Sequence, residues 1–285
     1  MVIWSLKVKK NEITIVCLGA FGDIINSTPI AKHYKMSGKF VRWIVRKKYK
    51  SVLDDNEFID EIKTITNERL DNSILSHKFR SSYFPSSCEK VIFTAPYMSL
   101  LYDGTHRSSL LKIIKEETSL INNWNCDFIP IIRLDHREES EARNFFTNLP
   151  EGKKVLVEFE AFSRQTFMTK ELFIQMVSKK RKDINFIFSS VNKPDWWSEI
   201  SNLNNVFHYS GSFKSNAKLY NLCDAFVGCS SGITCLTSSD YCQSDKIRIE
   251  NCFGDHWSTS FWTHNSKNKK LCYNAKQFLF ALEEM

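Results

Sequence analysis

Two glycine-containing turns in this sequence follow apolar runs and carry side chains that could do chemistry. The first turn, Gly19-Ala20-Phe21-Gly22-Asp23, comes after the β-rich run 13–18. Its glycines let the backbone turn sharply and come close to a ligand, and Asp23 offers a carboxylate that could accept a proton. By spacing alone, an Asp at a helix start is more simply a charge that complements the helix dipole.

The second turn, 228–234, follows the apolar run Ala225-Phe226-Val227. The free backbone N–H groups of a starting helix, together with small hydroxyl side chains, would suit a diphosphate. The residues concerned are Ser230, Ser231, Gly232, Ile233 and Thr234. An ordinary capped helix accounts for them equally well. Neither turn has the G-x-G-x-x-G spacing or the Lys-Ser/Thr of a P-loop, which excludes both of those phosphate-binding motifs.

Two further segments could contact an anion or an acceptor. An arginine at a strand end can hold a phosphate with both arms of its guanidinium, and one follows the predicted strand 155–159 in the run Ser163-Arg164-Gln165. The loop before the amphipathic stretch 108–121 carries Thr105, His106 and Arg107, which we expect to face a cleft near the acceptor. A helix capped by Thr105 or Ser108 is an equally good account of that loop.

Composition narrows the class of protein. The chain has 285 residues, of which 42% are hydrophobic and 25% charged, so it is not a disordered chain. No apolar run reaches the ~18 residues of a membrane helix, and the N-terminus lacks the pattern of a signal peptide. The nine cysteines include no C-x-x-C and no His pair has ligand spacing, so we expect no zinc site; without an export signal we expect no disulfide framework either. These features predict a cytoplasmic protein with reduced thiols.

The distribution of charged residues indicates what kind of partner the chain binds. Lys and Arg number 39 and Asp and Glu 32, which gives a net charge of +7. Many of the basic residues fall in four short runs, at 7–10, 46–50, 179–182 and 267–270. Single charge runs are usually solvated faces, but four in one chain favour a polyanionic partner.

Short apolar runs that alternate with helical periodicity predict an α/β protein. One strand–helix series starts at residue 13, and a second follows the turn cluster 148–152. We predict two doubly wound domains, 1–150 and 151–285, with the ligand cleft between them, outside the carboxyl ends of the strands. Glycine is scarce, at nine residues, so Gly211 after the predicted strand 206–209 is also expected near the ligand.

These turns and their flanking strands resemble those of glycosyltransferase family 9, the bacterial lipopolysaccharide heptosyltransferases. The stretch 15–29 looks like that family's opening strand, its Gly-Asp turn and its Thr-Pro helix. The segments 222–232 and 163–173 resemble its donor-binding strand and its nucleotide-side loop. The resemblance implies the GT-B fold, in which two Rossmann-like doubly wound domains face a central cleft. It places the acceptor side in 1–150 and the donor side in 151–285.

The resemblance also implies an activity, the inverting and metal-independent transfer of a sugar from a nucleotide-diphosphate sugar to an acceptor hydroxyl. Asp23 falls on the family's catalytic aspartate, the general base. Arg164 and the run Ser231-Gly232-Ile233 would steady the leaving nucleoside diphosphate. The sequence has no Asp-x-Asp, which suits an enzyme that needs no metal. The other candidate residues on the donor side are Gly22, Ser163, Gln165, Ser230 and Thr234, with Gly211 from its place after a strand; those on the acceptor side are Phe21 and Asn26, with Thr105, His106 and Arg107 from the loop described above.

The sequence departs from the family pattern at donor-side positions. Ser230 stands where the family has an Asp before Ser-Gly, Cys235 where it has a His, and Gln165 where it has a Lys. The pair Phe167-Met168 replaces its Trp-Pro. The sugar and the nucleotide base of the donor therefore stay open.

Three functions remain in play. The resemblance favours a lipopolysaccharide core or related surface glycan as acceptor. The net charge, the basic runs and a chain that is short for the family favour an alternative, a phage-type enzyme that glycosylates hydroxymethylcytosine in DNA. A non-catalytic protein that binds nucleotide sugars is the third, because the donor-side residues are altered.

Overall fold

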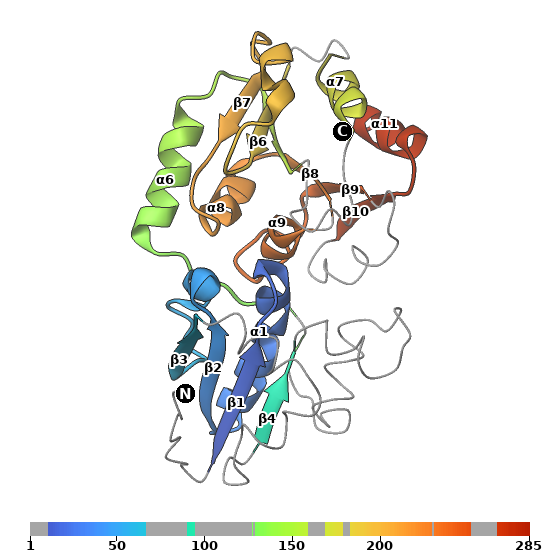
Figure 1. The fold of residues 1–285 in the computed structure, drawn as a ribbon. Coiled ribbons are helices and arrows are strands. Elements are labelled where there is room, and N and C mark those ends of the chain that lie inside the picture. The colour runs from blue at the N-terminus through green and yellow to red at the C-terminus, as the bar shows by residue number, and fades with distance from the viewer. Residues whose placement is uncertain are drawn as a thin grey trace. The chain divides into compact units, whose positions relative to one another are not determined.

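The computed structural model describes residues 11–66, 90–94, 127, 129–158, 169–178, 183–229, 231–251 and 267–285. The chain divides into two compact units, Met1–Phe128 and Ile129–Met285 (Figure 1). Each unit is built on a parallel sheet, so the predicted α/β class is confirmed. None of the helices in the described ranges has the length and apolar character needed to span a membrane.

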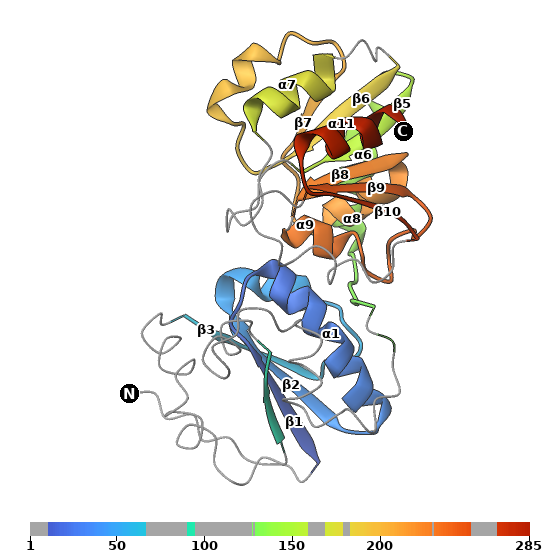
Figure 2. The same ribbon diagram turned by 90° about the vertical axis from the view of Figure 1, so that its right-hand side faces the viewer.

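The first unit has a parallel sheet with the strand order β3-β2-β1-β4 in its described part. Strand β1 lies in the middle and is buried along its whole length, as the apolar run 13–18 predicts for a strand covered on both faces. Helix α1 packs along β1 and β2 (Figure 2). The chain order reverses between β1 and β4, which makes the carboxyl ends of these two strands the switch point of the sheet. The elements are β1 (Glu12–Cys17), α1 (Phe21–Met36), β2 (Phe40–Arg46), the 3-10 helix η1 (Lys47–Leu53), β3 (Glu61–Ile65) and β4 (Lys90–Phe93).

The second unit has a six-stranded parallel sheet with the order β10-β9-β8-β5-β6-β7. Its switch point lies between β5 and β8, the first and fourth strands of this unit along the chain. The elements are α6 (His136–Thr147), β5 (Lys153–Val157), α7 (Lys170–Ser178), β6 (Ile184–Ser189), η3 (Asp195–Glu199), β7 (Val206–Tyr209), α8 (Ser215–Leu222), β8 (Ala225–Cys229), α9 (Gly232–Leu236), β9 (Ile247–Asn251), β10 (Asn268–Cys272) and α11 (Ala275–Glu283).

Helices cover both faces of this second sheet. Figure 1 shows α6 and α8 on one face and α7 and α11 on the other. The α7 and α11 side carries the main apolar core, in which Phe173 packs edge-on against Phe188 with the ring centroids 4.1 Å apart. Phe186 and Phe278 complete the same cluster and are almost fully buried. Parallel strands buried on both faces explain why the sequence reads here as short continuous apolar runs.

The division between the units falls at 128/129, not near the predicted 150. Helix α6 therefore belongs to the second unit, because it packs against α8 and the loops beside it. The Phe145 ring lies 4.8 Å from that of Tyr209, and Lys214 Nζ lies 3.1 Å from a carboxylate oxygen of Glu138. The turn cluster 148–152 connects a helix to a strand inside one unit. The predicted helix 108–121 lies outside the described residues.

Candidate functional site

Asp23 lies in the first turn of α1, directly after the carboxyl end of β1 and so at the switch point of the first sheet. Its Oδ2 accepts a hydrogen bond of 2.8 Å from the backbone N–H of Ala20, the N-cap residue. This bond fixes the side chain back over the turn. Within the part of the chain that is described, no group donates to the other oxygen, Oδ1.

Gly19 leaves room for this carboxylate. A Cβ at position 19 would stand 2.3 Å from Asp23 Oδ2 and 2.6 Å from Asp23 Cβ, far inside van der Waals contact. A side chain at this position would therefore displace the whole Asp23 side chain rather than only its tip. The sequence predicts that a glycine here lets the backbone approach a ligand; the structure shows that the missing Cβ makes room for the Asp23 side chain.

We expect Gly19→Ala to lower kcat about 10²-fold, because a misplacement of about 1 Å in a reacting group costs that much. The fold should survive, since the backbone at Gly19 does not have a positive φ. The matched control is Ala20→Gly in the same turn, which keeps the N–H that holds Asp23 and should retain turnover. Steady-state kinetics and thermal unfolding of both variants test this prediction. Equal kcat in Gly19→Ala and wild type would contradict the argument that a Cβ at position 19 displaces Asp23.

The Thr28-Pro29 step lies inside α1 and has a local explanation. Pro29 has no N–H to donate to the carbonyl of Ile25, one turn earlier. The hydroxyl of Thr28 donates to that same carbonyl at 2.6 Å, so the acceptor is still satisfied. Ser27 likewise donates to the carbonyl of Asp23 at 2.7 Å. These bonds let the helix continue past the proline and hold the turn that carries Asp23.

Burial raises the pKa of the Asp23 carboxyl to about 6, although the Ala20 N–H lowers it. A base with this pKa is mostly ionised at neutral pH and still binds a proton well, which is the range expected of a general base. The neighbouring Cys17 thiol has its pKa raised to about 12, first by burial and then by the Asp23 charge. Cys17 therefore stays protonated and is no nucleophile.

Phe21 and the basic 3-10 helix η1 lie next to each other in the first unit. The Phe21 ring packs edge-on against Tyr49, with the centroids 4.7 Å apart, and Lys48 Nζ lies 4.8 Å from the centre of the Tyr49 ring. Lys47 and Lys48 are exposed. Because η1 follows β2 and Asp23 follows β1, the basic residues stand at the same edge of the sheet as the carboxylate. Asn26, predicted on the acceptor side, is buried.

At the switch point of the second sheet, β8 leads into the short helix α9. Ser231 is the N-cap of α9, and its Oγ accepts from the Thr234 N–H at 3.2 Å. Thr234 is fully buried, and its hydroxyl donates to the Cys229 carbonyl, so this side chain serves the turn itself. Ser231 and Gly232 are only partly buried, and Ile233 is 9% exposed.

A residue that the sequence argument did not single out, Glu158, reaches this turn from the end of β5. Its Oε2 accepts from the Ser231 hydroxyl and lies 3.4 Å from Thr234 Oγ1. Burial raises the pKa of the Glu158 carboxyl to about 8, while the two hydroxyls and the backbone N–H groups of Ile233 and Thr234 lower it. At neutral pH the carboxyl is therefore mostly uncharged.

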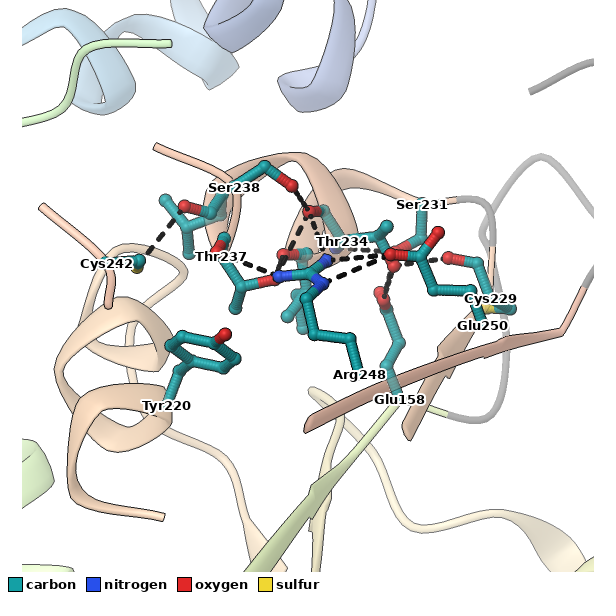
Figure 3. Close-up of polar contacts among 12 residues, drawn as sticks. Glu158, Tyr220, Cys229, Ser231, Thr234, Thr237, Ser238, Cys242, Arg248 and Glu250 are labelled. Carbon is teal, nitrogen blue, oxygen red and sulfur yellow. Dashed lines mark hydrogen bonds and ion pairs between the residues drawn. The ribbon is translucent and has the colours of Figure 1, made fainter. Parts of the chain in front are cut away.

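Beneath α9, a buried arginine holds the helix from strand β9 (Figure 3). Arg248 is fully buried and donates to the carbonyls of Thr234 and Thr237 at 3.1 and 2.9 Å. It also pairs with the fully buried Glu250 at 3.1 Å, and its guanidinium lies 4.9 Å from the centre of the Phe226 ring. Two carbonyls at the carboxyl end of this five-residue helix thus accept hydrogen bonds from Arg248.

The other predicted residues divide into two groups. Gly211 has a packing reason, because a Cβ there would stand 2.3 Å from the Tyr209 ring. Several lie outside the described residues: Ser163, Arg164 and Gln165 on one predicted loop, Ser230 in the second turn, and Thr105, His106 and Arg107. In the described ranges, no group of three or more His, Cys, Asp or Glu could hold a metal ion.

Comparisons with known proteins bear on the fold. No protein-family model and no curated protein sequence matches the chain. A solved structure of a glycosyl transferase family 9 protein from Veillonella parvula matches with a TM-score of 0.69 at 12% identity, covering 98% of this chain and 90% of that one. Two Escherichia coli structures cover 96% of this chain and 99% of their own: heptosyltransferase WaaC with ADP (TM-score 0.61, 14% identity) and ADP-heptose lipopolysaccharide heptosyltransferase II (0.59, 11%).

The likeness confirms the fold implied by the resemblance in the sequence. This chain has the GT-B type of architecture, two doubly wound α/β units each on a parallel sheet, in common with these glycosyltransferases. At 11–14% identity the likeness concerns the fold and leaves the chemistry to be argued from the residues of this chain.

Proposed function

We propose that this chain is a glycosyltransferase that moves a sugar from a nucleotide-diphosphate sugar to an acceptor hydroxyl, with Asp23 as general base. One observation carries the proposal: Asp23 stands at the switch point of the first sheet, fixed through Oδ2, while Oδ1 accepts no hydrogen bond from the described residues and burial raises the pKa of the carboxyl to about 6. Fold likeness to glycosyltransferases supports the same conclusion.

The reaction is a single displacement. Asp23 Oδ1 takes the proton of the acceptor hydroxyl while that oxygen forms its bond to the anomeric carbon. The bond between that carbon and the diphosphate oxygen breaks, and the nucleoside diphosphate leaves with the electron pair. Attack from the face opposite the leaving group inverts the anomeric centre.

The donor side is proposed at the turn between β8 and α9, where Ser231 and Gly232 are partly buried at the switch point of the second sheet. Ligands of doubly wound sheets bind outside the carboxyl ends of the strands at this point. Arg164 and its neighbours Ser163 and Gln165 follow β5 in the sequence and remain part of the proposal. An ADP-sugar is the first donor to try, because a matched heptosyltransferase structure holds ADP.

The turn can be tested directly with Gly232→Asp. A carboxylate at the first residue of α9 would repel the diphosphate and add a second acid beside Glu158, so nucleotide binding should fall below detection in calorimetry. The matched control is Gly232→Asn, which has the same shape without the charge and should retain most of the affinity. If both variants bind nucleotide as the wild type does, the diphosphate lies elsewhere.

For the acceptor we propose a polyanion, in the first place a lipopolysaccharide core or related surface glycan. The exposed Lys47 and Lys48, at the same sheet edge as Asp23, support an anionic acceptor. The net charge of +7 keeps hydroxymethylcytosine in DNA as the alternative. The six buried cysteines of the described ranges are thiols, which suits a reducing cytoplasm, where both acceptors could be met.

A transfer assay tests the proposal and separates the acceptors. The purified chain is mixed with UDP-, ADP- and GDP-sugars and either lipopolysaccharide core or duplex DNA containing hydroxymethylcytosine. Nucleotide release that depends on the core supports the glycan. A mass gain on the modified nucleoside after digestion supports DNA. Nucleotide binding without transfer to either acceptor favours the non-catalytic alternative.

A further inference from the structure

We propose that Glu158 is the positioning residue of the donor side: it fixes the turn between β8 and α9 and thereby sets the affinity for a nucleoside diphosphate. The inference rests on the proposed function, since it assumes that this turn receives the donor. It adds a residue that the resemblance in the sequence does not include.

The position of Glu158 in the fold is the first argument. It directly follows β5, and its backbone N–H donates to the Val227 carbonyl of β8 at 2.8 Å. Strands β5 and β8 form the two sides of the switch point. Glu158 therefore links the carboxyl end of β5 to that of β8. It lies beside the turn through which the chain passes from β8 into α9.

Its side-chain contacts are the second argument. The carboxyl reaches across to the Ser231 hydroxyl and to Thr234 Oγ1, at opposite ends of the first turn of α9 (Figure 3). The link therefore ties the amino end of α9 to β5, while Arg248 ties its carbonyls to β9. A helix of five residues has little stability of its own, so its position depends on these anchors.

Burial decides what kind of role Glu158 has. The residue is only 5% exposed and its carboxyl is directed to hydroxyl groups of its own unit, so it holds the turn and does not touch a ligand. A neutral carboxyl can both accept and donate hydrogen bonds without a buried charge. The amide of Gln has the same shape and the same dual capacity, whereas Ala leaves the two hydroxyls without this partner.

The experiment compares Glu158→Ala and Glu158→Gln with the wild type in titrations with ADP, UDP and GDP, and in donor kinetics. We expect Glu158→Ala to weaken nucleotide binding and raise the donor KM by about tenfold, the equivalent of one lost hydrogen-bonded anchor. Its kcat should stay within about threefold, because Asp23 is untouched. Glu158→Gln should bind nearly as the wild type does.

Asn185 provides the matched control at the other end of the same sheet. It is also buried in the second unit, and its side-chain amide donates to the carbonyls of Pro150 and Glu151 at 3.1 and 2.9 Å, beside the amino end of β6. Asn185→Ala should lower the melting temperature and leave nucleotide affinity unchanged. If it weakens binding as much as Glu158→Ala, loss of stability explains the effect and the inference is wrong.

The outcomes separate the inference from the proposed function. A wild type that binds none of the three nucleotides overturns the proposed function. A wild type that binds while Glu158→Ala binds equally well, or while Glu158→Gln is as weak as Glu158→Ala, overturns the role of Glu158. Should Glu158→Ala not fold, Thr234→Val removes the hydroxyl that lies 3.4 Å from the Glu158 carboxyl, together with its bond to the Cys229 carbonyl. Thr234 is fully buried, so weaker binding in Thr234→Val but not in Thr234→Ser would support the anchoring of the turn, and unchanged binding in Thr234→Val would overturn it.

Discussion

Asp23→Asn is expected to lower kcat/KM by about 10²- to 10⁴-fold, the contribution of a positioned general base. Asn has the shape of Asp, and its carbonyl oxygen can accept the hydrogen bond that Ala20 N–H donates to Asp23 Oδ2. The turn and α1 should therefore keep their structure, and nucleotide affinity should not change. The amide cannot take a proton from the acceptor, so the loss should appear in turnover.

The wild-type enzyme should show the matching pH dependence. The pKa of Asp23 is raised to about 6, and the active form of a base is the deprotonated one. The rate constant kcat/KM should thus be level above pH 7 and fall as the pH drops through 6, with about a tenth of the plateau left one unit below the pKa. The residual kcat/KM of Asp23→Asn should not show this decrease at low pH.

Asp55→Asn is the matched control for the charge change. Asp55 is exposed, lies in the same unit and has a φ of 65°, which Asn tolerates well. This variant should turn over like the wild type. Undiminished turnover in Asp23→Asn would remove Asp23 from the mechanism, and binding of nucleotide by a wild type that never transfers sugar would favour the non-catalytic alternative.

The sequence predicts the local elements well because parallel strands carry their own signal. Strand β1 was expected at 13–18 and lies at Glu12–Cys17, and β5 was expected at 155–159 and lies at Lys153–Val157. Continuous apolar runs bounded by glycine or charge specify such strands locally. The unit boundary needs long-range contacts instead. The turn at 148–152 looks like a linker, but long-range contacts such as the packing of Phe145 on Tyr209 and the Lys214–Glu138 ion pair assign α6 to the second unit.

The residues of the candidate site also differ in whether local sequence or long-range contacts identify them. The turn makes Asp23 a candidate, and the resemblance of its surroundings to a family is what favours it as the base. Glu158 could not be singled out, because an acid near the end of the predicted strand 155–159 looks like a solvated residue until β5 and β8 are known to be neighbours. Thr234 was expected at the donor, but its hydroxyl bonds to the Cys229 carbonyl, five residues back, in a turn that spacing alone does not specify.

Arg248→Met should be the most destabilising single change, with an expected loss of about 3–5 kcal/mol in the free energy of unfolding of the second unit. The substitution removes the guanidinium that pairs at 3.1 Å with Glu250, which is fully buried. It also leaves the carbonyls of Thr234 and Thr237 without these donors. Calorimetry should show the melting temperature of that unit lowered by on the order of 10 °C.

Two variants isolate the cause of that loss. Arg143→Met makes the same substitution at an exposed ion pair of 3.5 Å on α6, where the expected cost is under about 1 kcal/mol. Arg248→Met combined with Glu250→Gln removes the buried carboxylate as well and should recover part of the stability. The loss in the free energy of unfolding that the double variant does not recover measures what the hydrogen bonds from Arg248 to the carbonyls of α9 contribute. If the double variant is no more stable than Arg248→Met, the buried carboxylate is not what costs stability, and the lost bonds to α9 account for the whole effect.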